Sequence, residues 1–193
     1  MEITEKRLKK LRKVVKKRQS GFVVVLEDIH DPHNAAAVLR SCDTFGIQNV
    51  YFIFENEKEY NPKKVGKASS STANKWLDYK IYKDTKKCLT DLKNSDYKIF
   101  GTTLSKDSIK LENANFNTNK IALVFGNEHI GISKQAEKMC DKLVNLQQLG
   151  VVQSLNISVA AGIFLYEASR QRKNKYLLSA NKQSKLLKDF IKR

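Results

Sequence analysis

The chain has 193 residues, which suits one domain of moderate size, and 41% of them are hydrophobic, which is enough for a buried core. Its 36 lysines and arginines outnumber 20 acidic residues, and the resulting charge of +16 favours a polyanionic partner and salt-sensitive binding. The N-terminus is too charged for a secretory signal and no apolar run is as long as a membrane span, so we expect neither a signal peptide nor a transmembrane segment.

A basic amphipathic helix is predicted at the start of the chain. Residues 6 to 18 are mostly lysine and arginine, and Leu8, Leu11 and Val15 recur at helical spacing. One apolar stripe can therefore pack while the charged side faces a partner. A helix lying on a membrane surface would show the same pattern.

The first candidate motif joins an apolar strand, Gly21 to Leu26, to a helix from Asn34 to Phe45 that ends near Gly46. Asn34 and Arg40 lie six positions apart on this helix, on different faces. Arg40 can bind a phosphate or carboxylate with two parallel hydrogen bonds, and Asn34 can hold a ribose hydroxyl. A helix cap and a surface salt bridge explain the same residues.

The middle of the chain alternates strands and helices. Strands are predicted at Asn49–Phe54, Tyr97–Thr102, Lys120–Phe125 and Leu143–Leu146, and helices at Thr85–Ser95 and Ser133–Met139, the latter with Ser133 as N-cap. Lys64 to Lys75 gives no clear assignment, and Trp76 is expected to pack beside it. The alternation predicts an α/β fold with a mostly parallel sheet flanked by helices.

The second and third motifs are loops that follow strands. Gly126 and Glu128 end the strand at 120–125, where open α/β sheets bind ligands, and Gly126 permits close approach to the backbone. Ser154 and Asn156 precede the next helix and offer polar groups beside its free N–H groups. A turn with a solvated carboxylate, and ordinary helix capping, are the alternatives.

The helix predicted from Asn156 to Arg170 is apolar on nearly every side between Ile157 and Tyr166. Such a helix must be covered all round, either by a partner subunit or by the core of a monomer. A second basic run from Arg170 to the end carries another apolar stripe and predicts a C-terminal amphipathic helix.

Other chemistries are disfavoured by what the chain lacks. It has no glycine-rich dinucleotide or phosphate loop and no nucleophile elbow around Ser154. Its three cysteines, Cys42, Cys88 and Cys140, have no zinc spacing and indicate a reducing, cytoplasmic setting. The three histidines also lack metal-ligand spacing and are expected to be loop residues; they are His30, His33 and His129.

Taken together and in order, the three motifs resemble the SpoU family of SPOUT-class RNA 2′-O-ribose methyltransferases. The matching segments are Asn34 to Arg40, Ala122 to Glu128 followed by Gly131 and Ser133, and Gln153 to Ala161. The resemblance extends over about residues 20 to 170. It implies a fold with a deep trefoil knot near the C-terminus, a homodimer with its active site at the subunit interface, and bound S-adenosylmethionine.

The resemblance also implies roles for particular residues. The catalytic set is Arg40, Asn34, Glu128, Ser154 and Asn156. The cofactor pocket is expected to be lined by Thr102, Gly126, Leu146 and Leu155. By this resemblance Arg40 would act on the ribose 2′-hydroxyl, and the mechanism proposed for the family makes it the base. Since a guanidinium stays protonated, a milder role is to stabilise the alkoxide while a phosphate or water takes the proton. No metal is implied.

The terminal extensions make the chain most similar to the tRNA (guanosine-18) 2′-O-methyltransferases within that family. We expect a basic N-terminal extension (1–19), a SPOUT methyltransferase domain (20–170) and a basic C-terminal extension (171–193). The residues expected to bind tRNA are Lys9, Lys10, Arg12, Lys13, Arg170 and Arg172. The alternatives are a 2′-O-methyltransferase that acts on rRNA or on another tRNA position, a non-catalytic RNA-binding protein of the same fold, and a basic membrane-associated protein.

Overall fold

The computed structural model describes residues 3–64, 72–105 and 107–193, which contain a seven-stranded sheet with the order β3-β2-β1-β6-β4-β7-β5. Every neighbouring pair of strands is parallel. The strands are β1 (Phe22–Glu27), β2 (Asn49–Ile53), β3 (Asp78–Tyr82), β4 (Lys98–Thr102), β5 (Ile109–Lys110), β6 (Ile121–Phe125) and β7 (Lys142–Asn145). The predicted fold class, α/β with a mostly parallel sheet, is confirmed.

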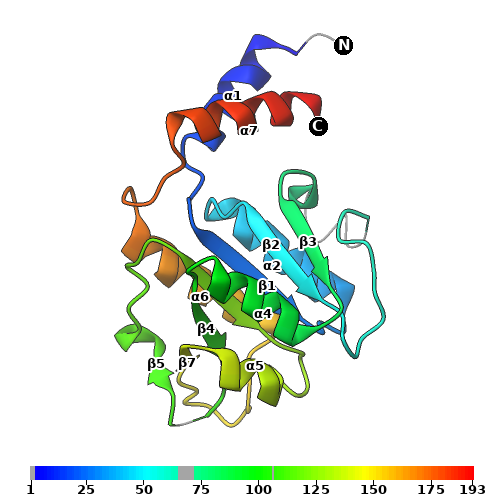
Figure 1. The fold of residues 1–193 in the computed structure, drawn as a ribbon, viewed down its shortest axis with the longest axis vertical. Coiled ribbons are helices and arrows are strands. Elements are labelled where there is room, and N and C mark those ends of the chain that lie inside the picture. The colour runs from blue at the N-terminus through cyan, green and yellow to red at the C-terminus, as the bar shows by residue number, and fades with distance from the viewer. Residues whose placement is uncertain (1–2, 65–71, 106) are drawn as a thin grey trace.

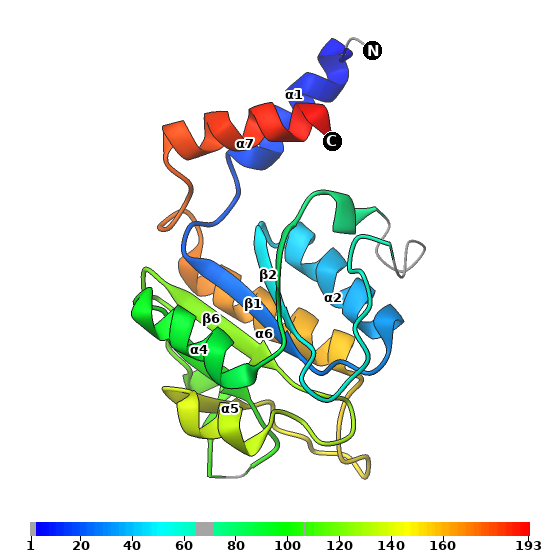
Figure 2. The same cartoon turned by 45° about the vertical axis from the view of Figure 1, so that its right-hand side comes forward.

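Helices cover both faces of the sheet, with α4 and α5 on one face and α2 and α6 on the other (Figures 1 and 2). The described helices are α1 (Glu5–Val15), α2 (Pro32–Thr44), α4 (Thr85–Asn94), α5 (Lys134–Met139), α6 (Ile157–Arg172) and α7 (Ala180–Lys192), with short 3-10 turns at Ala73–Lys75 and Leu111–Asn113. None of the described helices is long and apolar enough to cross a membrane.

The two central strands place the motif loops at one edge of the sheet. Every residue of β1 and β6 is buried, as expected for parallel strands with helices on both faces. Because β1 pairs in register with β6, from Phe22 opposite Ile121 to Leu26 opposite Phe125, their carboxyl ends stand side by side. The loops that leave these ends carry the first and second motifs.

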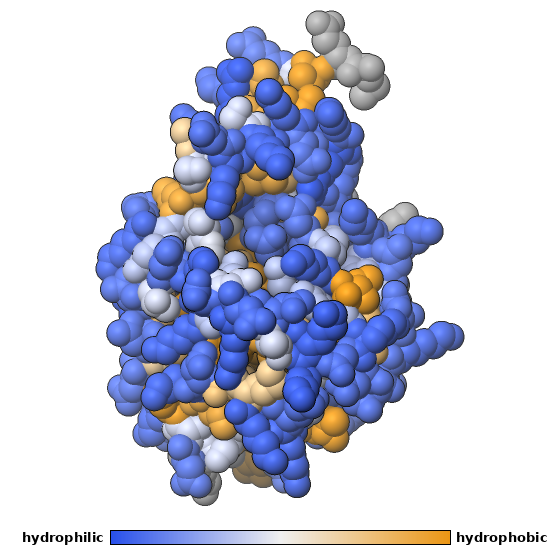
Figure 3. Space-filling view, viewed as in Figure 1, coloured by the Kyte–Doolittle hydropathy of each residue, from blue (hydrophilic) through white to orange (hydrophobic). Residues whose placement is uncertain are grey.

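The terminal helices α1 and α7 pack against each other, away from the sheet (Figure 1). Leu11, Val15 and Phe190 are buried between them, and the Trp76 ring meets the Phe190 ring edge-on at 5.2 Å. The Arg193 guanidinium donates to Asp78 at 2.5 Å and so ties the end of α7 to β3. Hydrophilic side chains cover most of both helices on the face seen in Figure 3.

The predicted strands, and the helices predicted between residues 34 and 170, agree with the structure within about two residues at each boundary. The N-terminal basic segment, predicted as helical over residues 6 to 18, is helical only as far as Val15, and the basic run from Arg170 is divided between the end of α6 and α7. The prediction missed β3 and β5, since β3 is an edge strand that contains polar residues and β5 has only two residues. Residues 65–71 of the unassigned segment lie outside the described residues, and Trp76 packs on α7.

The core of the single chain does not cover α6 on all sides. Ala161 and Leu165 face the sheet and are fully buried, whereas Val159, Ile163 and Tyr166 are 50%, 38% and 57% exposed. The three exposed residues lie at helical spacing and form an apolar strip along α6. The core of the single chain thus leaves this strip of α6 uncovered.

Candidate active site

Three side chains from the three motifs form one hydrogen-bonded chain at the carboxyl edge of the sheet. The Asn34 amide nitrogen donates to Glu128 Oε1 at 2.9 Å. The Asn156 amide nitrogen donates to Asn34 Oδ1 at 3.0 Å. Residues more than 90 positions apart in sequence therefore meet through direct contacts. The turn and capping alternatives, taken motif by motif, do not account for this convergence.

Glu128 is held in place by further donors. The backbone N–H groups of His30 and Asp31 donate to its two carboxylate oxygens at 2.9 and 3.3 Å. All the donors to Glu128 that the structure describes are uncharged N–H groups. Uncharged donors thus fix the orientation of the carboxylate.

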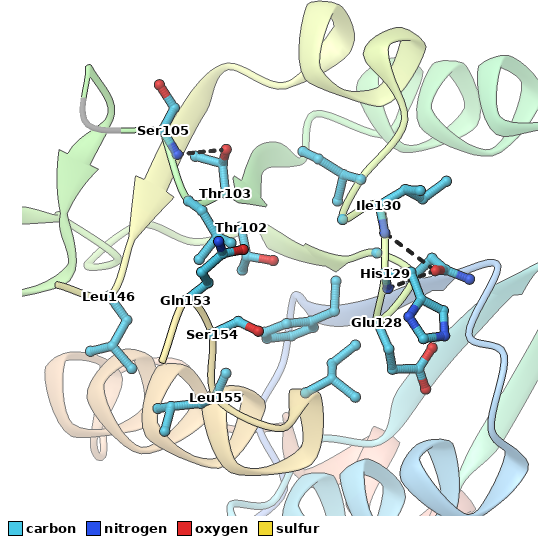
Figure 4. Close-up of a pocket in the computed structure, with 18 of the residues that line it drawn as sticks. Thr102, Thr103, Ser105, Glu128, His129, Ile130, Leu146, Gln153, Ser154 and Leu155 are labelled. Carbon is cyan, nitrogen blue, oxygen red and sulfur yellow. Dashed lines mark hydrogen bonds between the residues drawn. The ribbon is translucent and has the colours of Figure 1, made fainter. Parts of the chain in front are cut away.

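A cavity of about 330 Å³ adjoins Glu128, a volume typical of sites for small organic ligands. All four residues predicted to contact the cofactor line it: Thr102, Gly126, Leu146 and Leu155. In Figure 4, Thr102 and Thr103 stand on one side, Glu128 and His129 on the other, and the loop of Ser154 closes a third side. The predicted pocket residues therefore share one cavity.

The cavity has apolar walls and a polar rim. Phe125, Ile132 and Phe164 supply flat or branched apolar surface, and Gln153 and Ser154 supply side-chain donors and acceptors. An adenosine group needs this combination, because its faces are apolar and its edges form hydrogen bonds.

Gly126 is also required for the fold of its own loop. A Cβ built on it would lie 2.1 Å from the Gly131 carbonyl carbon, so glycine is needed for the loop to fold back on itself. The loop is anchored below by the buried Glu27, which accepts from the Ser133 backbone N–H at 2.9 Å and from its hydroxyl at 2.7 Å. The absence of a side chain at Gly126 thus allows two backbone segments to approach each other closely, and Gly126 also lines the cavity.

Asn156 and Ser154 have separate tasks. Asn156 caps α6, because its Oδ1 accepts from the Ser158 backbone N–H at 2.8 Å while its amide reaches Asn34. Ser154 does not cap the helix; it is exposed and lines the cavity. The prediction left the identity of the cap open between these two residues.

Arg40 stands apart from the rest of the catalytic set. It is exposed and does not line the cavity, and six helical residues place it about 9 Å along α2 from Asn34. Within the described residues, its guanidinium has no hydrogen-bond or ion-pair partner. The side chain is therefore free to act on a group that the single chain does not contain.

The predicted RNA-binding residues divide into two groups. Lys9, Lys10, Arg12 and Lys13 are exposed on α1. Arg170 is also exposed, with its guanidinium held at 2.8 Å by Glu167, a contact that lowers the pKa of that carboxyl.

The structure contradicts the prediction that Arg172 binds RNA. It is only 1% exposed, and its guanidinium donates to the carbonyl oxygens of Thr118, Ser20 and Asn119. Burial lowers its pKa to about 10. Arg172 joins three segments of the fold and is not available to RNA, because its position at the end of α6 turns it inward.

Sequence reasoning did not single out Glu57, which lies 3.1 Å from His30 beside the site. No motif contains it, because only the fold brings the end of β2 next to the end of β1. The described residues hold no cluster of three or more histidine, cysteine or acidic side chains suited to a metal ion.

Comparison with known proteins gives a consistent result. The model of the SpoU rRNA Methylase family matches residues 21–166. A tRNA (guanosine(18)-2′-O)-methyltransferase of Aquifex aeolicus is 35% identical over 92% of this chain and 82% of its own length. Another, of Borreliella burgdorferi, is 35% identical over 95% of this chain and 84% of its own length.

Solved structures of SpoU enzymes have a similar fold. The crystal structure of the A. aeolicus TrmH/SpoU tRNA modifying enzyme superposes with a TM-score of 0.87 at 34% identity, over 96% of this chain and 95% of that one. The structure of the SpoU methyltransferase AviRb from Streptomyces viridochromogenes in complex with AdoMet has a TM-score of 0.69 at 24% identity, over 84% of this chain and 62% of that one.

Proposed function

Because this chain belongs to the SpoU rRNA Methylase family, we propose that it transfers a methyl group from S-adenosylmethionine to a ribose 2′-hydroxyl of tRNA, at guanosine 18. The observation that carries the proposal is the hydrogen-bonded chain of Asn156, Asn34 and Glu128 at the rim of a cavity of cofactor size. The choice of tRNA is supported by the two relatives at 35% identity, whose names specify that nucleotide.

The cavity fits the cofactor in size and chemistry. Leu146 and Leu155 would supply apolar surface for the adenine, and Thr102 and Gln153 would supply polar contacts. Gly126 would contribute backbone rather than side chain to the wall. When bound, the cofactor supplies a methyl group already activated by the positive sulfonium.

The remaining work of the site is to place the ribose oxygen in line with that methyl group. Positioning of this kind accounts for much of the rate in a group transfer between bound partners. Glu128 and Asn34 form a fixed polar edge against which ribose hydroxyls can be oriented. Arg40 would stabilise the developing alkoxide, since its guanidinium carries a permanent positive charge.

The proposal includes a homodimer. The strip of Val159, Ile163 and Tyr166 is apolar and exposed, as an uncovered subunit interface would be. Arg40 lies on α2, which packs beside α6, so dimerisation across the strip would bring the Arg40 of one subunit towards the cavity of its partner. This accounts for its absence from the cavity of its own chain.

A deep trefoil knot is also part of the proposal. In support, β7 lies between β4 and β5, both of which precede it in the sequence, and the chain after β7 returns past the cavity to begin α6. In the proposed knot, Leu146 and Leu155 would lie in the segment that passes through it.

The proposed tRNA surface consists of Lys9, Lys10, Arg12, Lys13 and Arg170. Since α1 and α7 pack together, the N-terminal (1–19) and C-terminal (171–193) extensions would act as one unit attached to the methyltransferase domain (20–170). The basic unit would bind phosphates and the domain would modify the ribose, because phosphate contacts hold an RNA without reading its sequence.

The direct test incubates the protein with labelled S-adenosylmethionine and tRNA transcribed without modifications, then maps the methylated ribose. Methylation of guanosine 18 is the expected result. Methylation of rRNA or of another tRNA nucleotide would contradict the proposed substrate but support the proposed reaction. Cofactor-independent RNA binding without methyl transfer would instead identify a non-catalytic RNA-binding protein.

Subunit mixing tests the shared site. Arg40→Ala removes the guanidinium, and Ser154→Trp blocks the cavity, so each homodimer should be inactive. A mixed dimer keeps one complete site if Arg40 serves the partner, and it should recover up to about a quarter to a half of the activity. No recovery, in samples shown to contain mixed dimers, would place Arg40 and the cavity of one chain in the same site.

A further inference from the structure

A histidine and a glutamate form a close pair beside the candidate site. His30 follows β1, and Glu57 follows β2, the neighbouring strand. The Nδ1 atom of His30 lies 3.1 Å from both carboxylate oxygens of Glu57. The histidine side chain is 61% exposed, so the other edge of its ring faces solvent.

Residues at the ends of three strands fix the position of the loop that carries Glu57. Asp28, at the end of β1, accepts from the backbone N–H groups of Glu55, Asn56 and Glu57 at 2.8, 3.0 and 3.2 Å. Asn127, at the end of β6, donates to the Asp28 carbonyl at 2.8 Å and to Glu57 at 3.4 Å. The loop that carries Glu57 is therefore held in place before any ligand binds.

The same pair is connected to the catalytic motifs. The backbone N–H of His30 donates to Glu128 Oε2 at 2.9 Å, and Asn34 donates to the other oxygen of that carboxylate. The His30 ring also meets the His129 ring edge-on at 5.9 Å. His129 lines the cavity next to Glu128, as Figure 4 shows, so His30 stands one side chain away from the cavity.

The contact with Glu57 determines which nitrogen of His30 can accept a proton. In the neutral ring, a hydrogen on Nδ1 bonded to the carboxylate leaves the lone pair on Nε2. The hydrogen bond and the charge of Glu57, with smaller effects from Glu128 and Asp31, raise the pKa of His30 above its ordinary value. A base oriented by a carboxylate is the arrangement used to activate hydroxyl groups.

We propose that His30, oriented by Glu57, takes the proton from the ribose 2′-hydroxyl. The inference rests on the proposed function and assigns a step that Arg40 cannot perform, because a guanidinium stays protonated. The O–H bond breaks and its proton moves to Nε2, while the oxygen forms a bond to the methyl carbon. The carbon–sulfur bond breaks with its electron pair left on sulfur, and the imidazolium then releases its proton to water.

The test measures single-turnover methyl transfer against pH with saturating cofactor and tRNA. The wild type should lose activity at low pH as His30 becomes protonated. Its pH–rate profile should therefore have an acidic limb with its midpoint at the pKa of the His30 ring. His30→Gln should lose about 100-fold or more in rate and lose the limb, with cofactor and tRNA affinities nearly unchanged. Glu57→Gln should move the limb to lower pH, because the carboxylate that raises the pKa of His30 is gone.

His33→Gln is the matched control, since His33 is an exposed histidine on the same loop and helix start. It should keep the limb of the wild type. A His30→Gln protein with an unchanged rate and limb would overturn the inference and leave the methyltransferase assignment intact, as would a loss confined to tRNA affinity. A wild type that transfers no methyl group to any RNA would overturn both.

Discussion

The two ends of the molecule treat their charged and polar side chains in opposite ways. At the carboxyl edge of the sheet, Asn34, Glu128 and Asn156 bind one another and have defined positions. On α1, Lys9 and Lys13 project into solvent. Fixed geometry suits a reaction that depends on alignment, whereas exposed positive charge suits a long polyanion that must be captured and released.

The difference teaches that exposure and charge alone do not identify function in this chain. Arg170 and Arg172 lie two residues apart in the same basic run, yet one is exposed and the other is buried. Arg40 is exposed like the lysines of α1, but it lies in the first motif, for which we propose a catalytic role. Substitutions that affect rate, stability and RNA affinity separately can therefore test the division between the two ends.

Arg40→Ala should have the largest effect. Loss of the charge that stabilises the alkoxide should lower the rate of methyl transfer by about 1,000-fold, or roughly 4 kcal/mol. Cofactor affinity, measured by calorimetry, should stay within about twofold, because Arg40 does not line the cavity. Parallel loss of rate and cofactor affinity would assign Arg40 a structural role. Lys86→Ala, which removes an exposed cation on α4, serves as the control for rate.

Arg172→Met should reduce stability without a specific effect on RNA. It leaves the carbonyl oxygens of Ser20, Thr118 and Asn119 without their donor, which should cost about 3 kcal/mol and lower Tm by about 6–12 °C. Calorimetric or circular-dichroism melting measures the change. Arg170→Met is the matched control and should leave Tm within a degree or two. An unchanged Tm for Arg172→Met would remove it from the structural role.

Charge reversal at Lys9, Lys10 and Lys13 should weaken tRNA binding by about 10- to 100-fold and reduce the slope of log affinity against log salt by up to about 3. Filter binding or fluorescence anisotropy at several salt concentrations measures both. The same reversal at three exposed lysines of α4, Lys86, Lys87 and Lys93, provides a control of equal charge change. If both triple variants weaken binding equally, the α1–α7 unit has no special part in the RNA surface.

Asn156→Asp should have the smallest effect and separates the two tasks of this residue. Aspartate keeps the cap of α6, so Tm should change little. It loses the donor to Asn34 and places a negative charge beside that oxygen, so the rate should fall about tenfold, or roughly 1.4 kcal/mol. Asn156→Ala should lose both the cap and the rate. Full activity in Asn156→Asp would show that the contact with Asn34 is dispensable.

The sequence predicted those features that local pattern determines. The continuous apolar runs of β1 and β6 and the Ser133 cap were correctly assigned, because burial and capping leave signals within a few residues. The ordered motifs indicated that Asn34, Glu128 and Asn156 belong to one site. Their direct contacts could not be derived from spacing, since they depend on the strand order of the sheet.

Features that depend on tertiary packing were missed. The side chain of Arg172 points into the fold because it donates to three carbonyl groups from distant segments, and no local sequence pattern marks these groups. The pairing of His30 with Glu57 exists only because β1 and β2 are neighbours. The exposed strip on α6 was anticipated as a surplus of apolar residues, but which of them face outward required the fold.

A crystal structure with S-adenosylmethionine tests the central claim most directly. The account predicts the adenosine between Leu146 and Leu155, with the sulfonium methyl facing the edge formed by Asn34 and Glu128. It also predicts the Arg40 guanidinium of a second subunit on the far side of that methyl group. Cofactor bound at any other place, or Arg40 remote from the methyl group in every subunit, would contradict the account.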